Sequence, residues 1–149
     1  MTQPRLLSFA DWEKAAGAGL SGDPLWSVQA YRIAQYAVEC HLFDRRTNAR
    51  LAAAPAFGQL TRALGSIGAN IAEGYSRGSA ADRSRFYDYA LGSTREAISW
   101  YNTLQIELGP VADDRRALLV QIRRLLLTTL RNSRVKDPTE MLSDFKRRK

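Results

Sequence analysis

Residues 59–74 have the sequence QLTRALGSIGANIAEG, whose spacing predicts an amphipathic α-helix packed on two sides. Its apolar row recurs at alternating steps of three and four, as in the seam of an antiparallel bundle, and consists of Phe57, Leu60, Leu64, Ile67, Ile71 and Gly74. A second row with the same period carries hydrogen-bonding groups on a neighbouring face: Arg62, Ser66, Asn70, Glu73 and Arg77. This stretch therefore predicts architecture more strongly than it predicts a biochemical task.

Three further amphipathic segments accompany this helix, and no β-type alternation of useful length occurs. We expect long helices over about Leu25–Arg46, Pro55–Tyr75, Ala80–Leu108 and from Asp113 to about Ser133, with a turn over 47–53. Their remaining seams are Trp26, Ala30, Ile33, Ala37 and Cys40, then Phe86, Ala90, Ser93, Ala97, Trp100 and Leu104, then Leu118, Ile122, Leu125 and Thr129. Short connections between such segments predict an all-α fold, an antiparallel up-down-up-down four-helix bundle.

The ends of the chain differ from this central part. Ser8 and Asp11 resemble a capping box and predict a short extra N-terminal helix that ends near Ala16, before a glycine-rich loop. We therefore divide the chain into an N-terminal extension (1–24), a four-helix bundle (25–135) and a basic C-terminal tail (136–149). A chain of 149 residues suits a single core of this size.

Composition narrows the cellular setting. The single Cys40 excludes an internal disulfide framework and a cysteine-based zinc site, and its helical apolar surroundings favour an inert buried thiol. No segment is apolar enough to serve as a signal-peptide core or to cross a bilayer. We expect a cytoplasmic protein without a membrane partner.

The charge balance favours a polyanionic partner. Lys and Arg number 22 against 15 Asp and Glu, which gives a net charge of +7, and 18 of the 22 are Arg. The candidate contacts to RNA or DNA are Arg116, Arg123, Arg124, Arg131, Arg134, Lys146, Arg147, Arg148 and Lys149. A solvated helix face, or a coding bias that favours Arg over Lys, accounts for the same residues, so both interpretations stay open.

Three glycines lie inside predicted helices. Gly65, Gly68 and Gly92 should each cost about 1 kcal/mol relative to Ala, so something must offset that cost. Thr61, Gly65, Gly68 and Ala72 share one small-residue face. We expect another helix, from this chain or from a neighbouring subunit, to approach that backbone closely.

Polar residues gather across the turn between the second and third long helices: Ser66, Asn70, Glu73, Arg77, Arg85, Tyr89, Ser93 and Glu96. Antiparallel packing would pair Glu73 with Arg77 or Arg85 and would place Ser66 or Asn70 opposite Ser93 or Glu96. We interpret the set as a buried hydrogen-bonded network that fixes register and subunit pairing, with a ligand pocket as the alternative. If Glu73 is buried, its replacement by Ala should cost about 3 kcal/mol or more.

The residues of known catalytic chemistry are missing from the sequence. A metal-dependent bundle needs paired Glu-x-x-His motifs, whereas His41 is the one histidine and is more typical of a helix end or a packing position. Gly65-x-x-Gly68 cannot cradle phosphate, because helical N–H groups are already bonded. We predict no enzyme activity, no cofactor and no metal site.

The chain resembles a family through residues 66–67, 69–74 and 92–93 with Glu96, together with Arg77, Ser79 and Arg85-Phe86. It is similar to bacterial four-helix-bundle proteins first noticed as products of intervening sequences within 23S rRNA genes. The likeness covers about Gln59–Leu108 and Leu25–Phe43, but residues 61–65 and the helix before Gly17 depart from the pattern.

This resemblance implies a ring of five bundles that lacks a cofactor. Relatives of the family include the accessory variability proteins of diversity-generating retroelements, basic pentamers that bind a reverse transcriptase and nucleic acid. We expect a non-enzymatic homo-oligomeric scaffold, a pentamer, that binds nucleic acid or a nucleic-acid enzyme such as a reverse transcriptase. The alternative is a protein-interaction module with no direct nucleic-acid contact.

Overall fold

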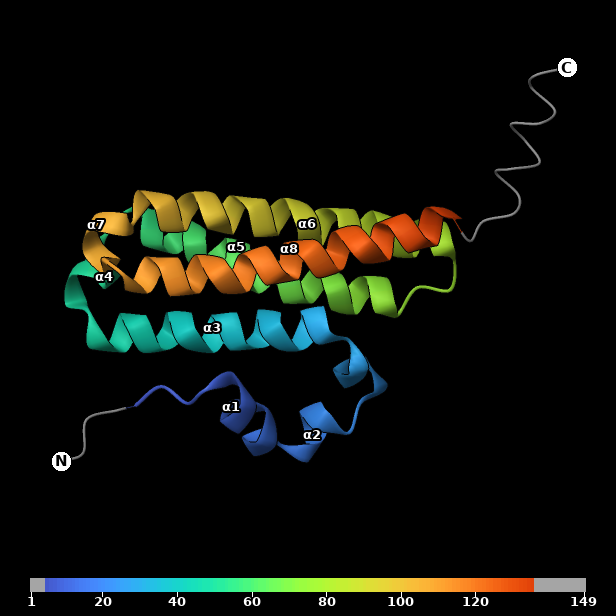
Figure 1. Ribbon diagram of the computed structural model, residues 1–149, viewed down its shortest axis with the longest axis horizontal. Coiled ribbons are helices and arrows are strands. Elements are labelled where there is room, and N and C mark those ends of the chain that lie inside the picture. The colour runs from blue at the N-terminus through green and yellow to red at the C-terminus, as the bar shows by residue number, and fades with distance from the viewer. Residues whose placement is uncertain (1–4, 136–149) are drawn as a thin grey trace, which may run out of the picture.

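The computed structural model describes residues 5–135, and all regular structure in this range is helical, as the sequence predicted (Figure 1). Its four long helices are α3 (Gln29–Thr47), α5 (Ala56–Tyr75), α6 (Ala80–Thr103) and α8 (Val111–Val135). The short elements are α1 (Phe9–Ala15), α2 (Ala18–Ser21), the 3-10 helix η1 (Pro24–Ser27), α4 (Ala49–Ala53) and α7 (Gln105–Leu108). The predicted tail over 136–149 lies outside the described residues.

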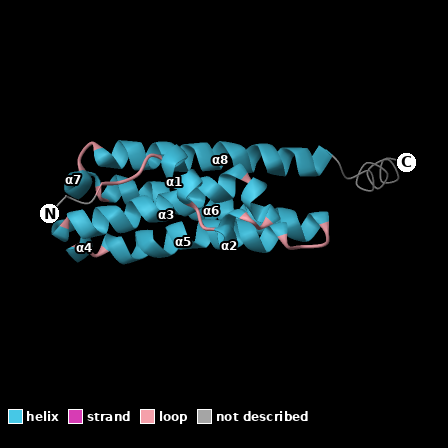
Figure 2. Cartoon of the chain, turned by 90° about the horizontal axis from the view of Figure 1, so that it is seen from below, coloured by secondary structure: helices cyan, strands magenta, loops and turns pink. Residues whose placement is uncertain are grey.

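The four long helices enclose the core. Helix α5 packs against α6 and α3, and α8 packs against the same two helices, so each long helix has two long neighbours. Figures 1 and 2 show them side by side; α1 lies next to α3, and α2 lies next to η1. Within residues 5–135, no helix is both long enough and apolar enough to cross a membrane.

The opening stretch behaves as its spacing predicts. All six residues of its apolar row, from Phe57 to Gly74, are buried in α5. Because α5 contacts both α3 and α6, this one row meets two helices at once. The periodicity of the sequence was sufficient here, since polar and small residues interrupt it on every other face.

The seams of α6 and α8 lie one residue away from several predicted positions. Helix α6 buries Tyr87, Thr94 and Tyr101 beside the predicted Ala90 and Ala97. Helix α8 buries Leu119, Leu126 and Leu130 where the sequence interpretation had favoured their neighbours Leu118, Leu125 and Thr129. Consecutive apolar residues permit two registers, so the sequence spacing could not distinguish them. The buried Thr94 hydroxyl keeps a hydrogen bond, because it donates to the Ala90 carbonyl 2.8 Å away.

Local capping explains the boundaries that differ from prediction. Helix α3 begins at Gln29 because Pro24 first opens η1, where Asp23 Oδ1 accepts from the Leu25 amide at 2.8 Å. The expected turn over 47–53 contains α4, which is capped by Asn48. Gly109, with φ 57°, ends α7 before Pro110.

The N-terminal extension packs against α3. Ser8 caps α1 as predicted, accepting from the Asp11 amide at 3.2 Å. The Tyr36 hydroxyl on α3 donates to the Leu7 carbonyl at 2.7 Å, and Arg32 Nε lies 2.6 Å from Glu13 Oε1. Rings of α1, η1 and α3 pack together in edge-on or tilted arrangements, with Phe9 5.3 Å from Tyr36 between ring centroids. The extension is therefore an ordered cover on one face of α3.

Candidate functional site

The predicted polar set does not form a buried network between helices. On α5, Asn70 Nδ2 donates to the Ser66 carbonyl at 2.9 Å. Glu73 pairs with Arg77 at 2.6 Å, but their side chains are 55% and 43% exposed. Arg77 follows the end of α5, so the pairing is a solvated i,i+4 contact at the C-terminus of that helix, and the expected buried Glu73 is corrected to an exposed one in the single chain.

The α6 members of the set also bond within their own helix. Arg85 pairs with Asp82 at 3.0 Å, and Glu96 accepts from Trp100 Nε1 at 3.2 Å. Tyr89 is half exposed, and Ser93 makes no side-chain hydrogen bond with the described residues. Neither the Glu73–Arg85 pairing nor a bond from Ser66 or Asn70 to this helix is present in the described part of the chain.

One contact joins the α5–α6 connection to α6. The Arg77 guanidinium lies over the Phe86 ring, 4.6 Å from its centroid, and Arg85 lies 5.5 Å from the same ring. Tyr89 meets Phe86 edge-on at 5.7 Å. Two cations and two aromatic rings therefore cluster beside the α5–α6 turn, on a surface open to solvent.

The three glycines have different surroundings. A Cβ built on Gly68 would lie 2.7 Å from Gln35 Nε2, so α3 does approach this backbone closely, as predicted. A Cβ on Gly65 or on Gly92 would meet nothing within 4 Å. The described chain therefore accounts for Gly68, whereas the neighbour expected at Gly65 and Gly92 is not supplied by residues 5–135.

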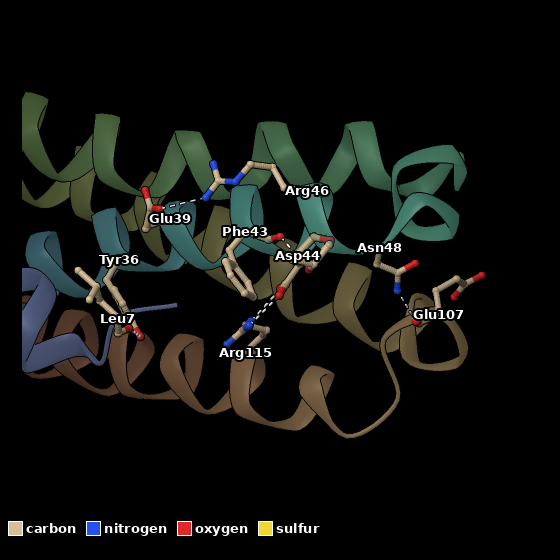
Figure 3. A network of polar contacts seen from close by, with 10 residues as sticks. Leu7, Tyr36, Glu39, Phe43, Asp44, Arg46, Asn48, Glu107 and Arg115 are labelled. Atoms are coloured by element: carbon tan, nitrogen blue, oxygen red, sulfur yellow. Dashed lines mark hydrogen bonds and ion pairs between the residues drawn. The ribbon is translucent and has the colours of Figure 1, made fainter. Parts of the chain in front are cut away.

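The buried polar centre lies elsewhere, between α3 and α8, and the sequence interpretation missed it (Figure 3). Arg115 Nη2 and Nε lie 2.7 and 2.8 Å from the two Asp44 carboxylate oxygens. The two side chains are only 11% and 6% exposed, so this is a buried bidentate ion pair. The sequence did contain a signal for this pair, because both charged residues occupy positions in buried helical rows. Asp44 continues the spacing of Ala37 and Cys40 on α3, and Arg115 lies between Ala112 and Leu119 on α8.

Cys40 and His41 precede this ion pair on α3. Burial raises the pKa of the Cys40 thiol to about 11, so the thiol is not an activated nucleophile. Burial lowers the pKa of His41 to about 4, although the negative charge of Asp44 acts in the opposite direction and raises it. The ring is therefore neutral at pH 7, stacks on Phe57 at 4.3 Å and bonds through Nε2 to Thr61 Oγ1 at 2.8 Å.

Tyr101 of α6 completes the centre. Burial raises the pKa of its phenol far above the ordinary value, and its hydroxyl has no hydrogen-bond partner among the described residues. The centre joins an ion pair, a protonated thiol and a neutral imidazole. The ion pair joins α3 to α8, and the His41–Thr61 bond joins α3 to α5. Residues 5–135 offer no cluster of three or more His, Cys, Asp or Glu for a metal ion.

The predicted basic residues of α8 fall into three groups. Arg116 is paired with Asp113 and partly buried, which corrects its assignment as a free phosphate contact. Arg123 is half buried and Arg124 and Arg131 are exposed, without an ion-pair partner in the described residues. The Arg134 side chain and Lys146–Lys149 lie outside the described part.

Comparisons with known proteins identify the family. Curated proteins and solved structures gave no significant match to the chain. Residues 32–125, well over half of the chain, match the family model named 23S rRNA-intervening sequence protein. The matched region starts in α3 and ends in α8, so it includes the polar centre and leaves out the α1–η1 cover. On this match and its all-helical structure, the chain belongs to the 23S rRNA-intervening sequence protein family.

Proposed function

We propose that this chain is a non-enzymatic scaffold that self-assembles, as a pentamer, and binds nucleic acid or a nucleic-acid enzyme such as a reverse transcriptase. Its building block is an antiparallel up-down-up-down four-helix bundle. Support for the bundle comes from the contacts of α5 and α8 with both α3 and α6, and from the short connections between successive long helices. The single free Cys40 favours a reducing compartment, so we place the scaffold in the cytoplasm.

The two uncovered glycines carry the proposal of self-assembly. Gly65 and Gly92 each cost about 1 kcal/mol in a helix interior relative to Ala, and nothing in the described chain lies within 4 Å of the Cβ that either lacks. Packing within the chain therefore gives no reason for a glycine at either position. Close approach by a second copy supplies one, because only a glycine lets two helix backbones meet without a side chain between them.

The exposed polar and aromatic groups beside the α5–α6 turn favour the same surface. Tyr89 is 52% exposed, and the Glu73–Arg77 pair lies on the outside of α5. Tyrosine and arginine are enriched among the few interface residues that contribute most of the binding free energy. A neighbouring copy packed here would bury them and complete the network that a single chain leaves open.

The nucleic-acid component rests on charge and on the family. The chain carries a net charge of +7, and Arg124 and Arg131 of α8 are exposed and unpaired within residues 5–135. Repetition of such a face around a ring would add weak phosphate contacts through avidity. We expect binding to fall steeply with salt and to show little dependence on base sequence.

Light scattering tests the assembly. A pentamer should give a particle of about 84 kDa, five times the 16.7 kDa chain. Gly92→Leu on α6 should reduce that mass, whereas Ala117→Leu, on an exposed position of α8, should leave it unchanged. A wild-type mass of one chain, or an unaltered particle with Gly92→Leu, would refute self-assembly through this face.

Ile106 favours the alternative of a protein-interaction module. This residue of α7 is 93% exposed, which is exceptional for a large aliphatic side chain. In that case the basic charge is incidental, and a nuclease-treated lysate should still yield one stoichiometric protein partner. Ile106→Ser should then abolish capture of the partner, while the scaffold proposal predicts no change in RNA binding by that variant.

A further inference from the structure

A groove runs between α6 and α8, away from the α5–α6 surface. It has a volume of about 600 Å³ and is lined by Asp88, Leu91 and Arg95 of α6 and by Leu127, Thr128, Leu130 and Arg131 of α8. On α6 the lining positions follow steps of three and four, and on α8 they occupy about one helical turn. The lining therefore extends about 10 Å along α6, which suits a short stretch of an extended ligand.

The charges of this groove are arranged for an anion. Arg95 and Arg131 are exposed on opposite sides, and neither has a carboxylate oxygen within 4.0 Å among the described residues. Arg124 is exposed one helical turn before the lining of α8. Asp88 is the one acidic residue of the lining, and it is exposed as well.

The floor of the groove is apolar. Leu91 and Leu130 are buried beneath it, and Leu127 is 44% exposed at its side. Aliphatic side chains here can contact a sugar or the face of an unpaired base, while guanidinium groups on either side reach phosphate oxygens. The apolar side chains favour a single strand over a duplex, because only in a single strand are base faces and sugars free to contact them.

We propose that this groove binds the phosphodiester backbone of a single-stranded nucleic acid, held by Arg95 and Arg131 from opposite sides. The proposal rests on the nucleic-acid binding proposed above and names its site. No aromatic ring lines the groove, so stacking contributes little and binding should be independent of sequence. The carboxylate of Asp88 repels phosphate at one end of the groove. Neutralising this residue therefore tests whether the strand binds in the groove.

Fluorescence anisotropy with a labelled 12-nucleotide oligouridine, and with a 12-base-pair RNA duplex, tests the site at 25 and 150 mM salt. We expect Arg95→Gln and Arg131→Gln each to weaken single-strand binding about three- to tenfold at low salt, and to lower the salt slope by about 0.7. Asp88→Asn should strengthen binding about threefold. A 12-nucleotide oligothymidine should behave as the oligouridine does, since the contacts are to phosphate.

Arg50→Gln is the matched control. Arg50 is exposed on α4 and lies outside the groove lining, and its replacement removes the same unit of charge, so this variant should weaken binding less than twofold. An effect of Arg50→Gln equal to that of Arg95→Gln would overturn the groove and leave diffuse binding by the scaffold. Preference for the duplex, an unchanged affinity with Asp88→Asn, or a changed particle mass with Arg131→Gln would also overturn it. Absence of any wild-type binding at 25 mM salt would reject the nucleic-acid function itself.

Discussion

The ion pair between Asp44 and Arg115 should be the most sensitive polar contact in the described fold. We expect Asp44→Val to lower the free energy of unfolding by about 3–5 kcal/mol, because the substitution leaves a buried guanidinium without its partner. The guanidinium cannot escape this cost by deprotonation, because an arginine side chain keeps its charge in proteins even when it is buried. The same loss is expected for Arg115→Met.

The magnitude follows from geometry and burial. Both carboxylate oxygens accept a guanidinium N–H, at 2.7 and 2.8 Å, and the side chains are 6% and 11% exposed. A solvated pair of the same type contributes only about 0.2–1 kcal/mol, because water screens it and both side chains lose freedom. Most of the expected loss is therefore the desolvation of the charge left behind, not the attraction that was lost.

Urea denaturation followed by circular dichroism measures this in a double-mutant cycle. Asp44→Val with Arg115→Met replaces both charges by apolar groups, and its stability should return to within about 1 kcal/mol of the wild type. Glu39→Gln provides the control on the same helix, because Glu39 pairs with Arg46 at 3.4 Å with side chains 40% and 55% exposed (Figure 3). This control should change stability by less than about 0.5 kcal/mol.

Two results would refute this reasoning. A loss with Asp44→Val no larger than that with Glu39→Gln would mean that water reaches Arg115. A double variant as unstable as either single variant would mean that lost packing, not an unpaired charge, causes the loss. All variants are compared at one protein concentration, since self-association would add a concentration-dependent stabilisation.

Three further predictions concern single residues. Burial lowers the pKa of His41 from 6.5 in the unfolded chain to about 4 in the fold. The stability that the neutral ring provides is therefore full above pH 6.5, and the free energy of unfolding should decline by roughly 3 kcal/mol as the pH falls toward 4. Urea titrations of His41→Gln should lack this decline, and a pH dependence identical to that of the wild type would contradict the prediction. Gly65→Ala should stabilise the dissociated chain by about 1 kcal/mol. Gly74→Ala should destabilise it, because the new Cβ would lie 2.8 Å from the Tyr87 ring. Equal shifts in melting temperature for the two variants would contradict the difference in packing between these glycines. Tyr101→Phe removes an unpaired buried hydroxyl and should be neutral or stabilising by up to about 1 kcal/mol in thermal melts, so a clear loss would reveal a partner for that oxygen.

The candidate site was harder to predict than the helices. The spacing of residues 66–77 indicated a second polar row on α5, but spacing cannot tell whether a neighbouring helix covers that row. The same limit applies to glycine, since Gly68 meets Gln35 while Gly65 meets nothing within 4 Å. Arg95 was missed as a basic contact because its groove partner, Arg131, is distant in sequence and comes near only through α6–α8 packing.

The sequence alone determined that the chain is helical, where α5 begins and ends within a residue or two, and six of the eight residues that α5 buries. These properties follow from local signals, since period, capping residues and helix breakers act within a few positions of one another. Tertiary structure decided the registers of α6 and α8, the burial of Asp44 with Arg115, and the exposure of Gly65, Gly92 and Glu73. Those depend on residues that are distant in sequence, because burial and ion pairing depend on which side chain the opposite helix presents at the same height.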